Sequence, residues 1–450
     1  MDDTARLWGP ETAKAIDNFP VSGEPIPVGV VRWLARIKAE AARVNAELGL
    51  LDPVVGAAIG AAADAVVAGD HDHQFPVDVF QTGSGTSSNM NANEVIAALA
   101  GSVADLDDRV NPNDHVNMGQ SSNDVFPTAV HLAALESITG GLLPALDGLA
   151  RSLSARADEF SDVVKAGRTH LMDAVPVMLG QEFAGYAAQV RLGADRVADT
   201  LPRLARVPLG GTATGTGLNT HPEFAERVRA RLHAATGLPV EPPADPFEAQ
   251  GARDALVEVS GALKVVAVSL TKIVNDLRWM ASGPRTGLAE IHLPELQKGS
   301  SIMPGKVNPV IPEVVAQVAA QVIGNDTAIT VGGMQGNLEL NVMIPMMARN
   351  LLGSIDLLAS ACRLLDERCV AGIRADRDAC ERHAEHTLAT ATALNPHIGY
   401  DRATEIVREA AATGRPLRDV AREHGVAESA LDEALDLHRI ARGSAPPTQL

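Results

Sequence analysis

The chain has 450 residues, of which 46% are hydrophobic and 21% charged, enough to bury the cores of two or three domains. A net charge of −18 argues against nucleic acid and anionic membrane surfaces as partners. Aromatic residues make up only 3% of the chain, so the core must consist mainly of Ala, Val, Leu and Ile, whose small side chains suit close packing between helices.

The sequence predicts no membrane-spanning helix, because Asp, Glu, Lys or Arg interrupts every helix-like segment. The first residues, Met1-Asp2-Asp3-Thr4, do not form a signal-peptide pattern. Cys362, Cys369 and Cys380 form neither a C-x-x-C pair nor an even disulfide set, so we expect ordinary buried thiols. These features predict a soluble protein of the reducing cytoplasm.

Residues 1–121 are predicted to form a mixed, mostly helical domain. Helical periodicity covers Val30–Leu48 and Val54–Ala68. A polar loop, Thr82–Asn91, then leads into a helix from Ala92 to about Gly101. The glycines of this loop are a weak signal for nucleotide binding because no buried strand precedes them, and a helix-capping loop is the simpler interpretation.

A second polar loop covers Asn111–Asp124. Asn-Pro and Asn-Asp are turn formers, and the many amides and hydroxyls of this loop suit hydrogen bonding to a small polar ligand. Solvent could satisfy the same groups.

Long segments with helical periodicity dominate residues 122–378, the predicted central domain. We expect five long helices, at Pro127–Phe160, Gly180–Leu204, Ala249–Met280, Pro309–Ile329 and Met343–Arg368. The third is apolar almost all round from Leu263 to Leu277, and a helix of this kind is buried on most faces. Several such helices favour a bundle that oligomerisation buries further. Residues 379–450 are expected to form a small C-terminal helical domain.

Two loops interrupt the predicted bundle, Gly167–Asp173 and Gly210–Asn219. The second is rich in glycine, but it lacks both the Lys-Ser/Thr of a P-loop and the strand of a Rossmann unit, which excludes those two nucleotide sites.

The stretch Gly299–Pro309 contains two glycines and two prolines in eleven residues, which excludes a helix or a central strand. Its polar side chains are Ser300, Ser301, Lys306 and Asn308. Pro309 is placed at the first position of the following helix, so the loop leads into a helix N-terminus, which favours bound anions. By composition alone, a flexible surface connection fits this stretch as well.

The pattern Gly-Ser-Ser-x-Met-Pro-x-Lys-x-Asn-Pro in this loop is similar to the signature of the fumarase/aspartase superfamily. Three further stretches resemble class II fumarate hydratases: T-G-S-G-T-x-S-N-M-N from Thr82, Q-S-S-N-D-x-F-P-T from Gln120, and G-G-T-A-x-G-T-G-L-N from Gly210. The resemblance covers the chain from Leu7 to Tyr400. It implies a mainly α fold of three domains with a long central antiparallel helical bundle, and a homotetramer whose active sites are shared between subunits.

The resemblance also implies an activity, the reversible hydration of fumarate to (S)-malate in the tricarboxylic acid cycle, with no cofactor. The reaction moves a proton at a carbon beside a carboxylate, through an aci-carboxylate intermediate. It therefore needs a base, a fixed anion-stabilising pocket and an acid for the departing hydroxyl.

Residue roles follow from the same resemblance. Ser300 would be the base, His170 would activate water or protonate the departing hydroxyl, and Glu313 would pair with that histidine. The implied substrate-binding residues are Ser84, Gly85, Thr86, Ser121, Ser122, Asn123, Thr169, Ser301, Lys306, Val307 and Asn308. A second anion site outside the catalytic pocket would comprise Arg109, Asn111, Pro112, Asn113 and Asp114. The family has a His-Pro-Asn-Asp turn there, and here Asn111 replaces the histidine.

Three alternatives stay open. Aspartate ammonia-lyase shares the fold and the loop; Thr169-His170 and Gly305 favour the fumarase, but the run Asn308–Val314 also resembles an aspartase. Argininosuccinate-type lyases share less of the flanking sequence. A non-catalytic protein of the lens-crystallin type is disfavoured because Ser300, Lys306 and His170 are all intact.

We expect no metal or cluster. No His, Cys, Asp and Glu residues occur at ligand spacing. Cys362 and Cys369 lie seven residues apart on one predicted helix, which separates them by roughly 10 Å, too far for a small iron–sulfur cluster.

Overall fold

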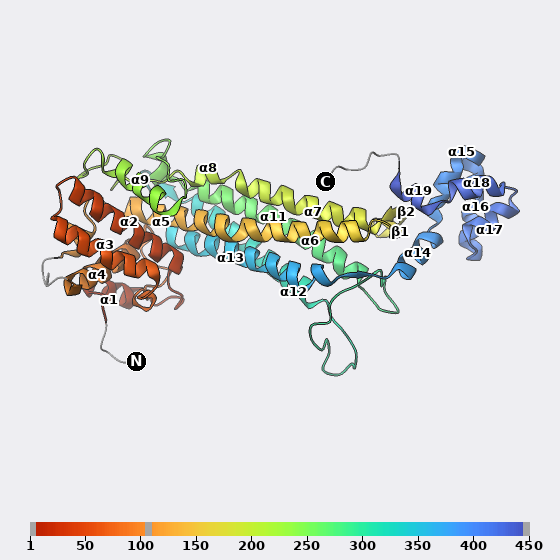
Figure 1. Cartoon of the computed structure of the whole chain (residues 1–450), viewed down its shortest axis with the longest axis horizontal. Helices are drawn as coiled ribbons and strands as arrows, with labels where there is room; N and C mark the ends of the chain where they lie inside the picture. Colours follow the sequence, from red (N-terminus) through yellow and green to blue (C-terminus); the bar gives the residue numbers. More distant parts are fainter. Residues whose placement is uncertain (1–5, 104–109, 444–450) are drawn as a thin grey trace. The chain divides into compact units, whose positions relative to one another are not determined.

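The computed structural model describes residues 6–103 and 110–443. Over these ranges the chain is mainly helical, as predicted (Figure 1). The same ranges contain three two-stranded antiparallel sheets. The chain forms two compact units. The first contains Met1–Pro144, Gly193–Val268 and Val318–Ser360, and the second contains Ala145–Leu192, Ser269–Gln317 and Ala361–Leu450. The division into three domains at residues 121 and 378 stays a prediction.

The first unit begins with four helices, α1 (Pro10–Asn18), α2 (Val28–Glu47), α3 (Pro53–Ala68) and α4 (Thr86–Val103), with a 3₁₀ turn, η1, at Asp72–Gln74 (Figure 1). Local signals fix the ends of α3: the Asp52 carboxylate accepts from the Val54 amide, Pro53 is the first helical residue, and Gly69 ends the helix at φ 93°. Helices α2 and α3 confirm the two predicted segments.

Helix α4 begins at Thr86, six residues before the predicted start at Ala92. Gly85 adopts φ 76°, and its carbonyl accepts the first helical hydrogen bond, from the Asn89 amide at 2.9 Å. The polar residues assigned to a loop therefore form the first turn of the helix.

The segment after the second polar loop also begins earlier than predicted. A π-helical turn, η2, covers Pro112–Val116, and α5 runs over Ser122–Ser137, followed by a π turn, η3, at Ile138–Leu142 and by α6 at Leu143–Glu159. Ser121 and Asp124 cap α5 reciprocally, which starts the helix five residues before Pro127.

The stretch Ser122–Glu159 meets the length and hydropathy criteria of a membrane-spanning helix, which the sequence analysis did not expect of any segment, although Glu136 lies within it. The core helix of a soluble protein meets the same criterion, and 61% of the apolar window is buried within the fold.

The other predicted long helices are confirmed as α7 (Leu179–Ala198), α11 (Asp254–Met280), α12 (Val310–Gly333) and α13 (Ile344–Arg368). Shorter helices flank them: α8 (Leu201–Leu204), α9 (Phe224–Thr236) and α10 (Glu248–Gly251), with a hairpin of β4 (Gly336–Asn337) and β5 (Leu340–Asn341) between α12 and α13. Polar groups on α11 are matched inside the first unit, where Asp326 accepts from Ser260 at 2.7 Å and pairs with Lys264 at 2.6 Å.

The second unit contains a hairpin where the sequence suggested only a loop. Strand β1 (Val164–Thr169) pairs with β2 (Met172–Met178), and β3 (Ile291–His292) pairs with β6 (Arg374–Ala375). The C-terminal part consists of η4 (Val370–Gly372), α14 (Arg377–His386), η5 (Leu388–Leu394), α15 (Asn395–Ile398), α16 (Tyr400–Thr413), α17 (Leu417–Glu423), α18 (Glu428–Ala434) and α19 (Leu437–Arg442). Its core includes Leu394, Ile406, Val420 and Leu431. All three cysteines are buried and free, as predicted.

Candidate active site

In the first unit, three hydroxyl groups from two polar segments form a connected chain. Ser84 Oγ lies 2.8 Å from Thr86 Oγ1, and Thr86 Oγ1 lies 2.7 Å from Ser122 Oγ. Ser84 is buried and the other two are half-buried. Residues separated by 36 positions thus present adjacent oxygens, each of which can donate or accept a hydrogen bond.

Two glycines allow the backbone to hold these hydroxyls. A Cβ on Gly85 would lie 2.2 Å from the Phe126 ring, and one on Gly83 would lie 1.7 Å from the Val342 carbonyl oxygen. The Gly83 carbonyl accepts from the Ile344 amide at 3.0 Å, which ties the loop to the start of α13. Side chains at either glycine would displace the loop.

Asp124, which the sequence analysis did not assign to the site, connects two of the polar segments. Its Oδ1 accepts from the Ser121 amide at 2.9 Å, and its Oδ2 accepts from the amides of Gly210 and Thr212 at 2.9 and 3.0 Å. Burial raises the pKa of Asp124 to about 6, against the lowering effect of these amides. The Ser-x-x-Asp spacing of a capping box was the signal that could have identified it.

Asn123 is held over the same glycine-rich loop. Its amide nitrogen donates to the Ala213 carbonyl at 2.9 Å. The loop therefore shapes the surroundings of a predicted substrate-binding residue through its backbone.

Lys38 is a second group that the sequence analysis did not assign to the site. The sequence contains few lysines, and this scarcity was the signal that could have identified it. The side chain is fully buried on α2, and Nζ donates to Asn117 Oδ1 at 3.3 Å and to Gln120 Oε1 at 3.1 Å. Burial lowers the pKa of Lys38 to about 7, and the nearby charge of Asp124 opposes this change. The buried Lys38 side chain therefore supports the polar loop that precedes α5.

In the second unit, His170 lies at the tip of the β1–β2 hairpin. Thr169 pairs with Met172, so His170 and Leu171 form a two-residue turn, with φ values of 58° and 60°. Positive φ at both positions defines a type I′ turn, in which Asn-Gly is usual. A histidine and a leucine are strained there, and such strain clusters at functional sites. Thr169 and His170 are both exposed.

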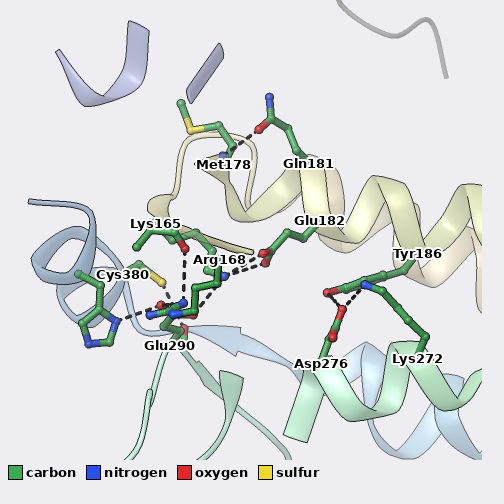
Figure 2. Close-up of polar contacts among 12 residues, drawn as sticks. Lys165, Arg168, Met178, Gln181, Glu182, Tyr186, Lys272, Asp276, Glu290 and Cys380 are labelled. Carbon is green, nitrogen blue, oxygen red and sulfur yellow. Dashed lines mark hydrogen bonds and ion pairs between the residues drawn. The ribbon is translucent and has the colours of Figure 1, made fainter. Parts of the chain in front are cut away.

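A cavity of about 690 Å³ lies beside this hairpin. His170, Arg168, Lys165, Glu182, Tyr186, Lys272 and Asp276 are among the residues that line it. Tyr186 donates to Asp276 at 2.9 Å, and Lys272 pairs with the same carboxylate (Figure 2).

The loop at Gly299–Pro309 contains no helix or strand, as predicted. Ser300 Oγ accepts from the amides of Ile302 at 3.2 Å and Met303 at 3.0 Å. The Gly299 amide donates to the Lys306 carbonyl at 2.8 Å, and the Asn308 side chain donates to the Gly299 carbonyl at 2.6 Å, which closes the loop.

Most of this loop is accessible, since Ser301 to Val307 are exposed. Helix α12 begins at Val310, so Pro309 precedes the helix rather than occupying its first position. Glu313 is in the first turn of α12.

Within the described ranges, no hydrogen bond or ion pair links His170 to Ser300 or to Glu313. The structure thus brings together the hydroxyls of Ser84, Thr86 and Ser122. Separately, it holds Ser300 by amides of its own loop. Within one chain it does not join His170, Ser300 and Glu313.

The predicted second anion site is described in part, because Arg109 lies outside the described residues. Asn111 Oδ1 caps η2 by accepting from the amides of Asn113 at 2.8 Å and Asp114 at 3.0 Å. The backbone amide of Asn111 donates to His115 Nδ1 at 2.9 Å. His115 therefore supplies an imidazole to the turn, four residues after the position where the family has one.

Across residues 6–103 and 110–443, no group of three or more His, Cys, Asp or Glu side chains could hold a metal ion.

Comparisons with known proteins agree on one family. A family model described as lyase matches residues 1–324, and one described as fumarase C C-terminus matches residues 391–442. A fumarate hydratase class II of Mycobacterium tuberculosis is 55% identical over 423 residues, covering 93% of this chain and 88% of the relative. That of Corynebacterium glutamicum is 52% identical over 438 residues, covering 96% and 92%.

Solved structures give the same picture. The class II fumarase of Schistosoma mansoni is 37% identical with a TM-score of 0.94, covering 98% of this chain and 96% of the other. A fumarate lyase:delta crystallin of Brucella melitensis, bound to cobalt, is 45% identical with a TM-score of 0.93, covering 98% and 97%.

Proposed function

The chain belongs to the class II fumarate hydratases, and from this premise we propose which of its residues bind and convert the substrate. The reaction is the reversible hydration of fumarate to malate, a carbon–oxygen lyase activity. The aspartate ammonia-lyase alternative has no support from the relatives described above, which carry the fumarate hydratase name.

Ser300 is the base that exchanges the proton beside the substrate carboxylate. The observation that carries this assignment is that Ser300 Oγ accepts two backbone N–H groups, from Ile302 and Met303. Donors aimed at an oxygen favour its anionic form, and a serine can act as a base only when its alkoxide is stabilised. The Lys306 ammonium and the N-terminus of α12 add positive potential to the same loop.

His170 activates the water or protonates the departing hydroxyl. Its exposed position at a strained turn leaves the imidazole free to meet substrate, and Glu313 pairs with it in the assembled site. Removal of the proton places a second negative charge on the substrate carboxylate, which Lys306 and Asn308 hold as the aci-carboxylate forms.

The other carboxylate and the hydroxyl of malate are bound by neutral donors. Ser84, Thr86 and Ser122 already form a hydroxyl chain, and Asn123 lies next in the sequence. We assign Thr169, beside His170, to the same task, and Gly85, Ser121, Ser301 and Val307 to backbone contacts. Neutral donors bind a dianion without adding charge that would trap the product.

The active form is a homotetramer with sites shared between subunits, located in the cytoplasm. Apolar side chains on the long helices face solvent in the single chain: Leu192, Val265, Val268, Ile323, Val331 and Leu357 are at least 36% exposed. Burial of such surface between copies would stabilise an assembly. Sharing of sites would also bring His170 and Ser300 together from different chains.

Ultraviolet absorbance of the fumarate double bond tests the activity. After exhaustive chelation and exposure to air, malate should produce fumarate and aspartate should not. Fumarate production from aspartate would favour the ammonia-lyase, and loss of activity that iron restores would contradict a reaction without a metal.

A further inference from the structure

A buried ionic cluster lies behind the hairpin that carries His170. Glu290 has no exposed side-chain surface, and two of its partners, Lys165 and Arg168, lie on β1 (Figure 2). Arg168 Nη1 is 2.8 Å from Glu290 Oε1, and Lys165 Nζ is 3.1 Å from Oε2 as an ion pair without an aligned hydrogen bond. The third partner is His383 of α14, whose Nδ1 is 3.0 Å from Oε1.

The cluster contains a second acid on the cavity side. Lys165 Nζ lies 2.9 and 3.0 Å from the two carboxylate oxygens of Glu182 on α7. Lys165, Arg168 and Glu182 line the same cavity as His170, whereas Glu290 does not line it. Glu290 therefore contacts Lys165 and Arg168 from the buried side, away from the cavity, and it cannot itself touch a substrate there.

Glu290 is fixed by its backbone as well as by its side chain. Its amide donates to the Met280 carbonyl at the end of α11, and its carbonyl accepts from the Asp376 amide at 2.9 Å. Burial alone would raise the pKa of Glu290, but Lys165, His383 and Arg168 together hold it below its ordinary value. A carboxylate that is ionised, buried and fixed by its main chain is a rigid anchor for β1.

The geometry of β1 explains why both cations reach this anchor. The pairing register shifts between Ala166 and Arg168, and a Cβ on Gly167 would lie 2.5 Å from the Val175 carbonyl oxygen. An irregularity of this kind re-aims nearby side chains. Arg168 is held only two residues before His170, so its orientation fixes the strand that enters the strained turn.

We propose that Glu290 is a positioning residue for fumarate hydration, which acts by fixing Lys165 and Arg168 and thereby the turn that presents His170. This inference rests on the proposed role of His170. A displacement of about 1 Å in a reacting group can cost about a hundredfold in rate, so a modest loosening of β1 is enough to matter.

A double-mutant cycle tests the proposal, with kcat and KM measured for wild type, Glu290→Gln, His170→Asn and the double variant. Glu290→Gln keeps the size of the side chain and removes its charge. We expect it to lower kcat by about 10- to 100-fold with KM changed less than about threefold, since substrate contacts are untouched. On the His170→Asn background the same change should cost less than about threefold, because the two residues act through one group.

The control is Asp162→Asn. Asp162 pairs with Arg377 at 2.9 Å, so it connects the segment before β1 to α14 through an exposed ion pair. Its removal should leave kcat unchanged. Circular dichroism and the oligomeric mass should match wild type in every variant.

If Glu290→Gln does not fold, Arg168→Gln replaces it in the cycle and should give the same pattern with a smaller loss. The inference is overturned if the variant retains wild-type kcat while His170→Asn is impaired, or if the full loss recurs on the His170→Asn background. Wild-type kcat in His170→Asn would instead refute the proposed role of the histidine, and the inference with it.

Discussion

Thr86 Oγ1 lies 2.7 Å from Ser122 Oγ, so the first residue of α4 and the first residue of α5 meet through their hydroxyls. A helix N-terminus attracts anions. Here the N-termini of α4 and α5 are joined by two hydroxyl groups that can turn toward a ligand. We propose that this pair is the centre of the half-site, meaning the part of the active site that binds the substrate carboxylate that does not become the aci-carboxylate.

Replacement of Thr86 by valine tests that half-site, because valine keeps the shape and removes the hydroxyl. We expect KM for malate to rise about tenfold with kcat within about threefold, the effect of one lost hydrogen bond to a charged group. Ser102→Ala is the control: Ser102 is also on α4, but its hydroxyl donates to the Leu99 carbonyl at an exposed position. An unchanged KM in Thr86→Val would remove the pair from the substrate site.

Ser300→Ala should lower kcat by roughly 10²- to 10⁴-fold, the usual contribution of a positioned base. The amides of Ile302 and Met303 would lose an acceptor, but they are exposed and water can replace it. The fold, checked by circular dichroism, should therefore be unchanged. Near wild-type turnover would show that another group is the base.

Shared active sites predict complementation between two inactive variants. Ser300→Ala and His170→Asn proteins, denatured and refolded together, should recover part of the activity, because some sites would combine an intact serine and an intact histidine from different chains. Each variant refolded alone is the control. Zero recovery, with mixed tetramers demonstrated by mass, would contradict shared sites.

Asn111→Ala separates the proposed second anion site from catalysis. Loss of the two amide hydrogen bonds that Asn111 accepts should cost about 1 kcal/mol of stability and weaken dicarboxylate binding there, with kcat within about threefold. The measurement is anion titration of enzyme whose main site is blocked by a tight inhibitor. A hundredfold loss of kcat would place this turn in the catalytic site.

Lys38→Met should change how stability depends on pH. Because burial lowers the pKa of Lys38 to about 7 from 10.5, the unfolded chain binds a proton that the folded chain lacks between these values. Stability therefore rises with pH across this window, by up to about 1.4 kcal/mol per pH unit, and this contribution is lost as the pH falls through about 7.

The measurement is urea unfolding between pH 7.5 and 9. Lys38→Met should remove the upward slope. Lys14→Met, which alters an exposed lysine paired with Glu11, should retain it. The raised pKa of Asp124, about 6, acts in a separate window, since its contribution is lost as the pH rises from about 4 to about 6. An equal slope in wild type and Lys38→Met would contradict a buried neutral lysine.

The long helices could be predicted because their signal is local and repeated: α11, α12 and α13 each run for more than five turns of apolar periodicity. The polar loops could be located from their glycines, prolines and amides. Helix starts were less accurate, since at Ser122 a reciprocal cap and at Thr86 a positive-φ glycine set the first turn, and both occur within residues that also suit loops.

Contacts between segments that are distant in the sequence could not be predicted in this way. Asp124 meets Gly210, Lys38 meets Asn117, and Glu290 meets Lys165, and none of these pairs leaves a periodic trace in the sequence. The β1–β2 hairpin was missed because its turn is His-Leu rather than Asn-Gly, so the usual indication of a hairpin is lacking.

The His170–Leu171 turn has a consequence for engineering this enzyme. Glycine at position 171 would adopt φ 60° without the cost that leucine bears, so selection for heat resistance alone would favour that replacement. Selection for turnover would act on the neighbouring position, because asparagine, the residue best suited to the turn, has no imidazole to offer. At the hairpin tip, therefore, position 171 can be changed to raise thermostability, whereas a change at position 170 removes the imidazole that turnover requires.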